Sequence, residues 1–144
     1  MRLGANTRPT GGEIDIFEFN LDWAQDRAWG SYHWGLPGEC GKDRAPIPGK
    51  GIKPAGAGDN WQEDWHVYAV EWYEDRIDYF VDNKKFLTID DSGGRLLPTS
   101  PMFIIFDQAV DSWLFPPASG AGDFNGTAGV RMRVAWVRAY RASA

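Results

Sequence analysis

Residues 65–89, WHVYAVEWYEDRIDYFVDNKKFLTI, contain the pattern that decides the fold class. Three runs in this stretch, rich in aromatic and β-branched residues, are predicted to be strands: 65–72, 77–82 and 86–89. The residues between the runs, at 74–76 and 82–84, are polar and have the length of hairpin turns. Short hairpins join strands that run antiparallel. The sequence therefore predicts an antiparallel meander in an all-β protein.

The chain on both sides of the meander continues the β pattern. Four further strands are predicted: 13–19, 29–34, 101–106 and 130–140. The run PMFIIF at 101–106 is continuously apolar, which is typical of a strand covered on both faces. In the last strand the alternation places Arg131, Arg133 and Arg138 on the solvent face. The stretch 37–60 is dense in Gly, Pro and Lys and is predicted to be a long loop, of a length that is often functional.

The architecture follows from these elements. No segment of helical length shows a 3.6-residue period, and the sequence has no internal repeat. At 144 residues the chain is expected to form a single domain, 1–144. About two thirds of the surface that the unfolded chain exposes would be buried in a domain of this size. Two packed antiparallel sheets, a β-sandwich, are the expected arrangement.

Composition limits the kind of ligand. Lys and Arg number 15 against 20 Asp and Glu, and the net charge of −5 argues against nucleic acid or an anionic membrane as partner. The 8 Trp, 5 Tyr and 8 Phe exceed the needs of the core, so some are predicted to contact a ligand. Cys40 is the single cysteine, which excludes a disulfide within the chain and a cysteine-based metal cluster. No apolar run has the length of a membrane span or of a secretory signal.

An acidic strand stands out at residues 11–19, GGEIDIFEF, because Glu13, Asp15 and Glu18 fall within six positions. Strict alternation would place Glu18 on the apolar face with the two isoleucines. A single β-bulge near Ile16 and Phe17 shifts the register by one residue. We therefore predict a bulge that brings all three carboxylates to one face and turns Phe19 inward.

The spacing of these carboxylates fits one kind of chemistry. Glu13 and Glu18 would lie about four strand steps apart, or roughly 13 Å between Cα atoms at about 3.3 Å per residue. Side chains that lean inward would bring the carboxyl groups to roughly 5 to 7 Å, close to the pair of a retaining glycosidase. Asp15 would hydrogen-bond the nucleophile and raise the pKa of the acid. The alternatives are a solvated acidic face or a calcium site, but neither explains the surplus of aromatic residues.

Five segments of the chain match a set of short motifs, in the same order. Residues 13–18 resemble the signature E-[IL]-D-[IVF]-x-E, and 65–72 resemble F-H-x-Y-A-x-E-W. Residues 76–82 are similar to R-I-x-x-Y-V-D, and 101–110 to P-F-x-L-I-L-N-x-A-V. Residues 134–140 are similar to V-D-Y-V-R-V-Y. Together these segments resemble glycoside hydrolase family 16, in the form of its laminarinase-like β-1,3-glucanases. The resemblance implies a concanavalin A-like jelly roll, a form of antiparallel β-sandwich.

The resemblance also implies roles for individual residues. Glu13 is the expected nucleophile, Asp15 its assistant and Glu18 the general acid and base. Four further residues are expected to contact the substrate: His33, Trp34, Asp107 and Trp113. His66 lies in the regular meander and is expected to be structural.

Three places in the chain depart from the family pattern. Asp107 replaces the usual Asn, and DSW at 111–113 replaces the common G-G-x-W, which leaves the sugar preference open. Ala135 stands where the family often has an Asp that helps bind calcium, so no metal is expected, and no cofactor.

The expected function is retaining, endo-acting hydrolysis of β-1,3- or mixed β-1,3/1,4-glucan, with the polysaccharide as partner and an extracellular location. Transglycosylation, a galactan substrate, a non-catalytic carbohydrate-binding or structural domain, and an interaction module remain alternatives. Family members carry further strands before the acidic motif. We therefore expect the sandwich to lack its usual N-terminal strands. Either a second copy or a complementing chain covers its open edges, or the chain forms a minimal, rearranged sandwich.

Overall fold

The structure is a computed structural model, and it describes most of the predicted β elements. The described residues are 12–19, 27–35, 50–52, 64–92, 94–107 and 132–141. The chain divides into two compact units, Met1–Met102 and Phe103–Ala144, and each is described by itself. Within the described ranges, no helix has the length and apolar character needed to cross a membrane.

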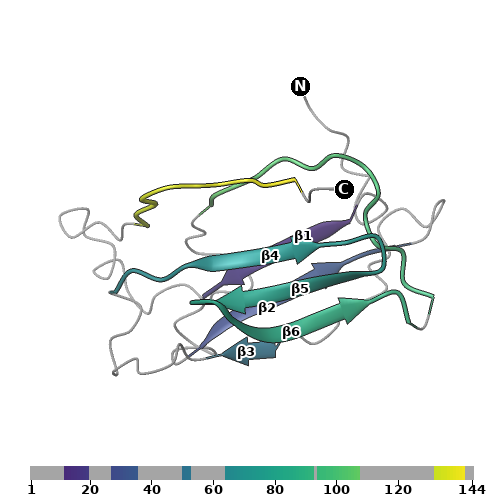
Figure 1. Ribbon diagram of the computed structural model, residues 1–144, viewed down its shortest axis with the longest axis horizontal. Helices are drawn as coiled ribbons and strands as arrows, with labels where there is room; N and C mark the ends of the chain where they lie inside the picture. The colour runs from purple at the N-terminus through teal and green to yellow at the C-terminus, as the bar shows by residue number, and fades with distance from the viewer. Residues whose placement is uncertain are drawn as a thin grey trace, which may run out of the picture. The chain divides into compact units, whose positions relative to one another are not determined.

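The first unit contains two three-stranded antiparallel sheets (Figure 1). The strands of one sheet, in spatial order, are β1 (Glu13–Glu18), β2 (Ala28–His33) and β3 (Lys50–Ile52). The strands of the other, also in order, are β4 (Tyr68–Trp72), β5 (Arg76–Val81) and β6 (Lys84–Asp90). β1 packs against β4, and β3 packs against β6. The expected all-β antiparallel sandwich is therefore confirmed.

β3 corrects one prediction. It lies inside the stretch 37–60, which was expected to be loop throughout. A strand of three residues, KGI, is too short to show a period of two, and its neighbours are rich in Gly and Pro. Pairing with β2 makes it a strand, because backbone hydrogen bonding does not require a hydrophobic pattern.

The meander of β4, β5 and β6 is confirmed, with a shorter first strand than predicted. Asp82 and Asn83 form the tight turn before β6 with φ of 48° and 64°, a conformation that Asn and Asp tolerate well. The Asp82 carboxylate lies 2.7 Å from His66 Nδ1 and accepts a 3.0 Å hydrogen bond from the Val67 amide. These contacts hold 66–67 at the turn, so β4 begins only at Tyr68. His66 thus makes a structural contact.

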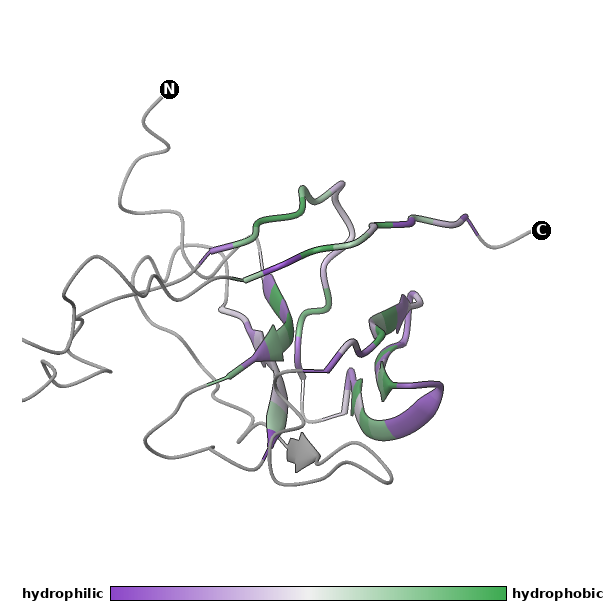
Figure 2. Ribbon diagram, turned by 90° about the vertical axis from the view of Figure 1, so that its left-hand side faces the viewer, coloured by the Kyte–Doolittle hydropathy of each residue, from purple (hydrophilic) through white to green (hydrophobic). Residues whose placement is uncertain are grey.

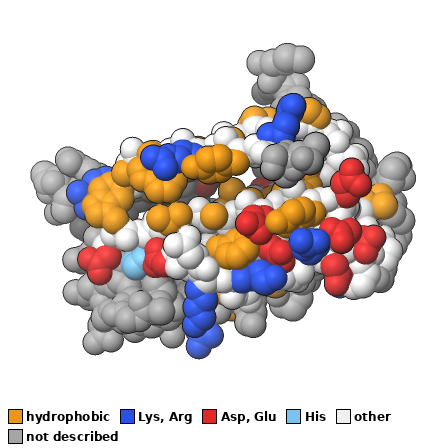
Figure 3. Space-filling model, in the orientation of Figure 1, with side chains coloured by type: hydrophobic (Ala, Val, Ile, Leu, Met, Phe, Trp, Pro, Cys, Tyr) orange, Lys and Arg blue, Asp and Glu red, His pale blue; other side chains and the backbone are white. Residues whose placement is uncertain are grey.

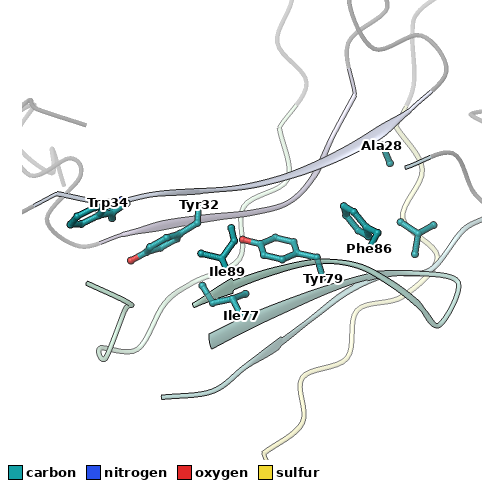
Figure 4. Packing of buried hydrophobic residues seen from close by; sticks show 8 residues of the cluster. Ala28, Tyr32, Trp34, Ile77, Tyr79, Phe86 and Ile89 are labelled. Atoms are coloured by element: carbon teal, nitrogen blue, oxygen red, sulfur yellow. The ribbon is translucent and has the colours of Figure 1, made fainter. Parts of the chain in front are cut away.

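The core lies between the two sheets (Figure 4). Its buried members come from β2, β5 and β6 and from the residue after β2: Ala28, Tyr32, Trp34, Ile77, Tyr79, Val81, Phe86 and Ile89. The Tyr79 and Phe86 rings meet edge to face at 6.2 Å. Phe17 of β1 stacks on Tyr68 of β4 at 4.1 Å, which fastens the two sheets at another point. The turned view in Figure 2 shows hydrophobic and hydrophilic stretches along the ribbon.

A buried carboxylate lies on the outer side of β5. Asp78 is 3% exposed and accepts hydrogen bonds from Arg76, Lys85 and Thr88. Burial raises the pKa of Asp78, but the bonds from Thr88 and Arg76 and the charge of Lys85 outweigh it, and its pKa is lowered overall. Figure 3 shows the same mixture of acidic and basic side chains over this face.

Two predicted strands are not strands in the structure. Residues 101–107 and 132–141 lie outside both sheets, and their side chains are exposed, reaching 72% for Phe103 and 82% for Tyr140. An apolar run shows which residues would gain from burial, but a strand also requires a neighbouring strand with which to form a hydrogen-bonded ladder. In the part of the chain that is described, neither segment has such a neighbour. The predictions at 101–106 and 130–140 are therefore wrong over their described residues.

Candidate active site

The register of β1 on β2 contains the predicted bulge. The paired positions are Glu13 with His33, Ile14 with Tyr32, Asp15 with Ser31 and Glu18 with Trp29. Two residues of β1, Ile16 and Phe17, therefore face the single residue Gly30 of β2. Residues paired across an antiparallel ladder share a face, and positions 29, 31 and 33 alternate onto the same face of β2. The three carboxylates consequently line one face of the sheet.

The other face of the bulge requires Gly30. A Cβ atom added at this position would lie 2.6 Å from Cδ1 of the buried Tyr79 ring and 3.2 Å from Cζ of Phe86. Real Cβ atoms do not approach neighbours so closely in a packed interior. The glycine thus lets β2 lie directly on the core of the second sheet while its alternate residues face the carboxylates.

Ser31 connects two of the three carboxylates. Its Oγ lies 2.9 Å from Asp15 Oδ2 and 2.7 Å from Glu18 Oε2. The same Asp15 Oδ2 atom lies 3.2 Å from His33 Nε2. The Tyr79 hydroxyl, from β5, donates a 2.7 Å hydrogen bond to the Ser31 carbonyl oxygen. The carboxylate face is therefore attached to the core of the opposite sheet through Ser31.

The electrostatics single out Glu18. Although the residue as a whole is exposed, surrounding protein atoms reduce the hydration of its carboxyl group, and this burial raises its pKa above the ordinary value. A hydrogen bond donated by Ser31 lowers the pKa, and the charges of Asp15 and Glu13 raise it. The charge of His33 lowers it. The net pKa shift is upward, which favours a carboxyl group that holds its proton.

The structure brings together four of the residues predicted from sequence: Glu13, Asp15, Glu18 and His33. Trp34, expected to contact substrate, instead belongs to the core cluster and is 8% exposed. It follows His33 directly, so alternation turns it to the apolar face, away from the carboxylates. Its expected contact with substrate gains no support from this position and stays a prediction.

Three other residues complete the comparison with the sequence. Asp107 is exposed and belongs to the second unit, and Trp113 lies outside the described residues, so both roles remain predictions. Ser31 was not predicted. The signal was present, since Ser31 precedes His33 by two positions on a strand and must share its face.

Two further features bear on ligands. Among the described residues, no group of three or more His, Cys, Asp and Glu side chains is arranged to hold a metal ion. An open hollow of about 410 Å³ lies at the end of β4, lined by residues of two segments: Trp72, Tyr73, Glu74, Pro98 and Thr99. None of the three carboxylates lines this hollow.

A family model described as Glycosyl hydrolases family 16 matches residues 2–137. The chain belongs to glycosyl hydrolases family 16. The matched range includes the bulged strand with its three carboxylates and the meander. The expected membership is therefore confirmed.

Two other proteins are similar to part of this chain. A beta-glucanase of Acetivibrio thermocellus is 38% identical over 56 residues, which are 36% of this chain and 16% of that protein. A second similarity is to the laminarinase catalytic domain from Thermotoga maritima MSB8, solved by crystallography in complex with cetyltrimethylammonium bromide. The sequence identity is 30% and the TM-score is 0.43. That match covers 58% of this chain and 31% of the laminarinase chain. The family member thus spans less than a third of either relative.

Proposed function

We propose that this chain carries the catalytic carboxylates of a retaining, endo-acting hydrolase of β-1,3- or mixed β-1,3/1,4-glucan. Glu13 is the nucleophile, Glu18 the general acid and then base, and Asp15 the residue that assists them. One observation carries the proposal: the bulge opposite Gly30 lines up the three carboxylates on one face of the sheet. The raised pKa of Glu18 supports the division of roles, because the acid of a retaining pair must hold a proton before reaction.

The proposed reaction has two steps. In the first, a Glu13 oxygen forms a bond to the anomeric carbon while the glycosidic bond breaks, and Glu18 gives its proton to the departing oxygen. In the second, a water molecule attacks the same carbon, Glu18 takes a proton from that water, and Glu13 leaves. A sugar hydroxyl in place of this water would give transglycosylation.

The spacing of the two glutamates is compatible with retention of configuration. Glu13 pairs with His33 and Glu18 with Trp29, four positions further back on β2. The Cα atoms of the two glutamates are therefore about 13 Å apart at about 3.3 Å per residue. Side chains that converge by about 3 to 4 Å each bring the carboxyl groups to roughly 5 to 7 Å. Retaining pairs lie about 5 to 5.5 Å apart, against about 6.5 to 9.5 Å for inverting pairs.

The partner proposed for this site is the polysaccharide, and an extracellular location, where such polymers are found, is part of the proposal. A second copy or a complementing chain on the sheet edges is also proposed. Its test is the molar mass of the purified chain by light scattering, with and without a soluble glucan.

The deciding experiment measures reducing-sugar release from laminarin, lichenan and agarose by the purified chain. Glu13→Gln is expected to abolish the release, because the amide cannot form the covalent intermediate. Asp91→Asn, which neutralises an exposed carboxylate after β6, is the matched control and should leave it unchanged. A folded chain that binds laminarin without releasing sugar would instead support a carbohydrate-binding domain.

A further inference from the structure

The Ser31 hydroxyl faces more acceptors than it can serve as a donor. Its Oγ is within hydrogen-bond distance of Asp15 Oδ2, at 2.9 Å, and of Glu18 Oε2, at 2.7 Å. A serine hydroxyl has one hydrogen and can accept through its lone pairs. It can therefore donate to only one of the two carboxylates at a time. If both are ionised, the other contact brings two oxygen atoms together with no hydrogen between them.

Both contacts are satisfied when one carboxyl group is protonated and donates to Ser31. His33 Nε2 lies 3.2 Å from the same Asp15 Oδ2 that faces Ser31, so Asp15 is the carboxylate placed to stay ionised and accept. Glu18 is the one whose pKa is raised. The arrangement that satisfies every contact is a chain in which Glu18 donates to Ser31 and Ser31 donates to Asp15.

The backbone holds Ser31 in this position. Ser31 is 6% exposed and lies in the central strand of its sheet, between β1 and β3. The hydroxyl of Tyr79, a core residue 0% exposed, donates to its carbonyl oxygen at 2.7 Å. Figure 4 shows Tyr79 extending from its strand into the space between the sheets. Ser31 therefore cannot move away from the carboxylates without breaking a contact in the core.

On the basis of the function proposed above, we propose that Ser31 is a positioning residue that holds Glu18 as an oriented, protonated acid beside an ionised Asp15. When Glu18 gives its proton to the glycosidic oxygen, the single hydrogen of Ser31 can turn to the new Glu18 carboxylate. Asp15 keeps its contact with His33 at that moment. The hydroxyl thus accepts from Glu18 in its acid form and donates to Glu18 in its base form.

The sign of the effect follows from counting hydrogen bonds. With Glu18 protonated, Ser31 makes one bond to each carboxyl group; with Glu18 ionised, it makes one bond in all. A hydrogen bond that Ser31 donated to Glu18 alone would lower the pKa of Glu18. Here Asp15 takes the single hydrogen while Glu18 is protonated, so the hydroxyl favours the protonated form. This adds to burial and to the effects of Glu13 and Asp15 on β1, and it opposes that of His33 on β2. Tyr79 of β5 also faces this cluster, and burial raises its pKa, so it stays neutral. Removal of the hydroxyl should lower the pKa of Glu18.

The first test compares the pH dependence of kcat/KM for wild type, Ser31→Ala and Ser31→Thr on a glucan that wild type hydrolyses. The alkaline limb reports loss of the acid's proton. We expect Ser31→Ala to move this limb to lower pH by about 0.5 to 1 unit, the worth of one neutral hydrogen bond. Ser31→Thr keeps the hydroxyl and should restore the wild-type limb. An unchanged limb, or one at higher pH, in folded Ser31→Ala would overturn the proposal.

The second test does not depend on activity. The carboxyl ¹³C resonance of Glu18 is titrated by NMR in wild type and Ser31→Ala, and the midpoint should fall in the variant. If Ser31→Ala does not fold, Ser31→Cys serves in its place, since a thiol is a poor donor and acceptor of similar shape. If the midpoint shifts but wild type hydrolyses no glucan, the proposed function is rejected, while the effect of Ser31 on the pKa of Glu18 stands. Hydrolysis without a shifted midpoint would reject the role of Ser31 alone.

Discussion

Each sheet of the sandwich contains a carboxyl group whose hydration the surrounding protein atoms reduce, and the two groups have opposite neighbours. On β5, Asp78 lies among Arg76, Lys85 and Thr88, and its pKa is lowered. On β1, Glu18 lies beside a serine hydroxyl and two further carboxylates, and its pKa is raised. Burial raises the pKa of both carboxyl groups, and the hydrogen bonds and basic neighbours of Asp78 reverse the direction there.

The difference teaches how to distinguish a structural carboxylate from a reactive one. Basic side chains and several donors around Asp78 stabilise its charge, so it behaves as the centre of a polar contact between β5 and β6. Burial is the largest cause of the raised pKa of Glu18, and the charges of Asp15 and Glu13 add to it, so the group is prepared to hold and transfer a proton. Burial raises the pKa of both groups, and only at Asp78 do the partners outweigh it.

The largest expected effect is a loss of activity when Glu18, the reactive carboxyl group of this comparison, is replaced. Glu18→Gln cannot donate a proton, and it should reduce kcat on laminarin by about 10² to 10⁴, the usual contribution of general acid and base catalysis. On an aryl glycoside whose leaving group needs no proton, the variant should slow the first chemical step much less. Burst kinetics on that substrate would check this. Equal losses on both substrates would contradict the assignment of Glu18 as the acid.

A smaller effect is expected on the structural side. Asp78→Asn removes the charge that Arg76 and Lys85 face and should lower the free energy of unfolding by about 1.5 to 3 kcal/mol. Urea denaturation measures this value. The activity per folded molecule should stay at the wild-type level. A loss of activity without a loss of stability would show that the two carboxylates do not have separate roles.

The smallest effect sharpens the comparison through pH. The folded-state pKa of Asp78 is lowered, so the stability that it provides is present above its ordinary value of 3.8 and is lost as pH falls through the folded pKa. The folded-state pKa of Glu18 is raised, so its ionisation costs stability as pH rises above 4.5. Urea midpoints from pH 3 to 8 should show Asp78→Asn losing most above pH 3.8. The stability of Glu18→Gln relative to wild type should instead rise above pH 4.5. If the urea midpoints of the two variants depend on pH in the same way, both assignments are contradicted.

Much of the fold was predictable because its signals are local. The turn residues Asp82 and Asn83 fix a hairpin, and the misfit of Glu18 in a regular strand indicated a bulge before any partner strand was known. The three carboxylates followed from that bulge. Each of these inferences uses only the period of a strand and the chemistry of a turn.

The remainder depended on neighbours that are distant in sequence. β3 becomes a strand only by pairing with β2, and Phe103 stays exposed although its segment is strongly apolar. Trp34 was assigned to the ligand because of its ring, whereas its place on the strand turns it to the core. Ser31 is inconspicuous in the sequence, and its contacts with Asp15 and Glu18 appear only when the register is known.

Tyr79 belongs to the core and supports the carboxylate face at the same time. A change to Phe at this position would keep the volume of the core and remove the hydroxyl that fixes the Ser31 carbonyl. Substitutions that are neutral for packing are therefore not neutral for the site. Evolution and protein engineering have fewer acceptable choices at position 79 than the size and polarity of a core residue would suggest, although this residue touches no substrate.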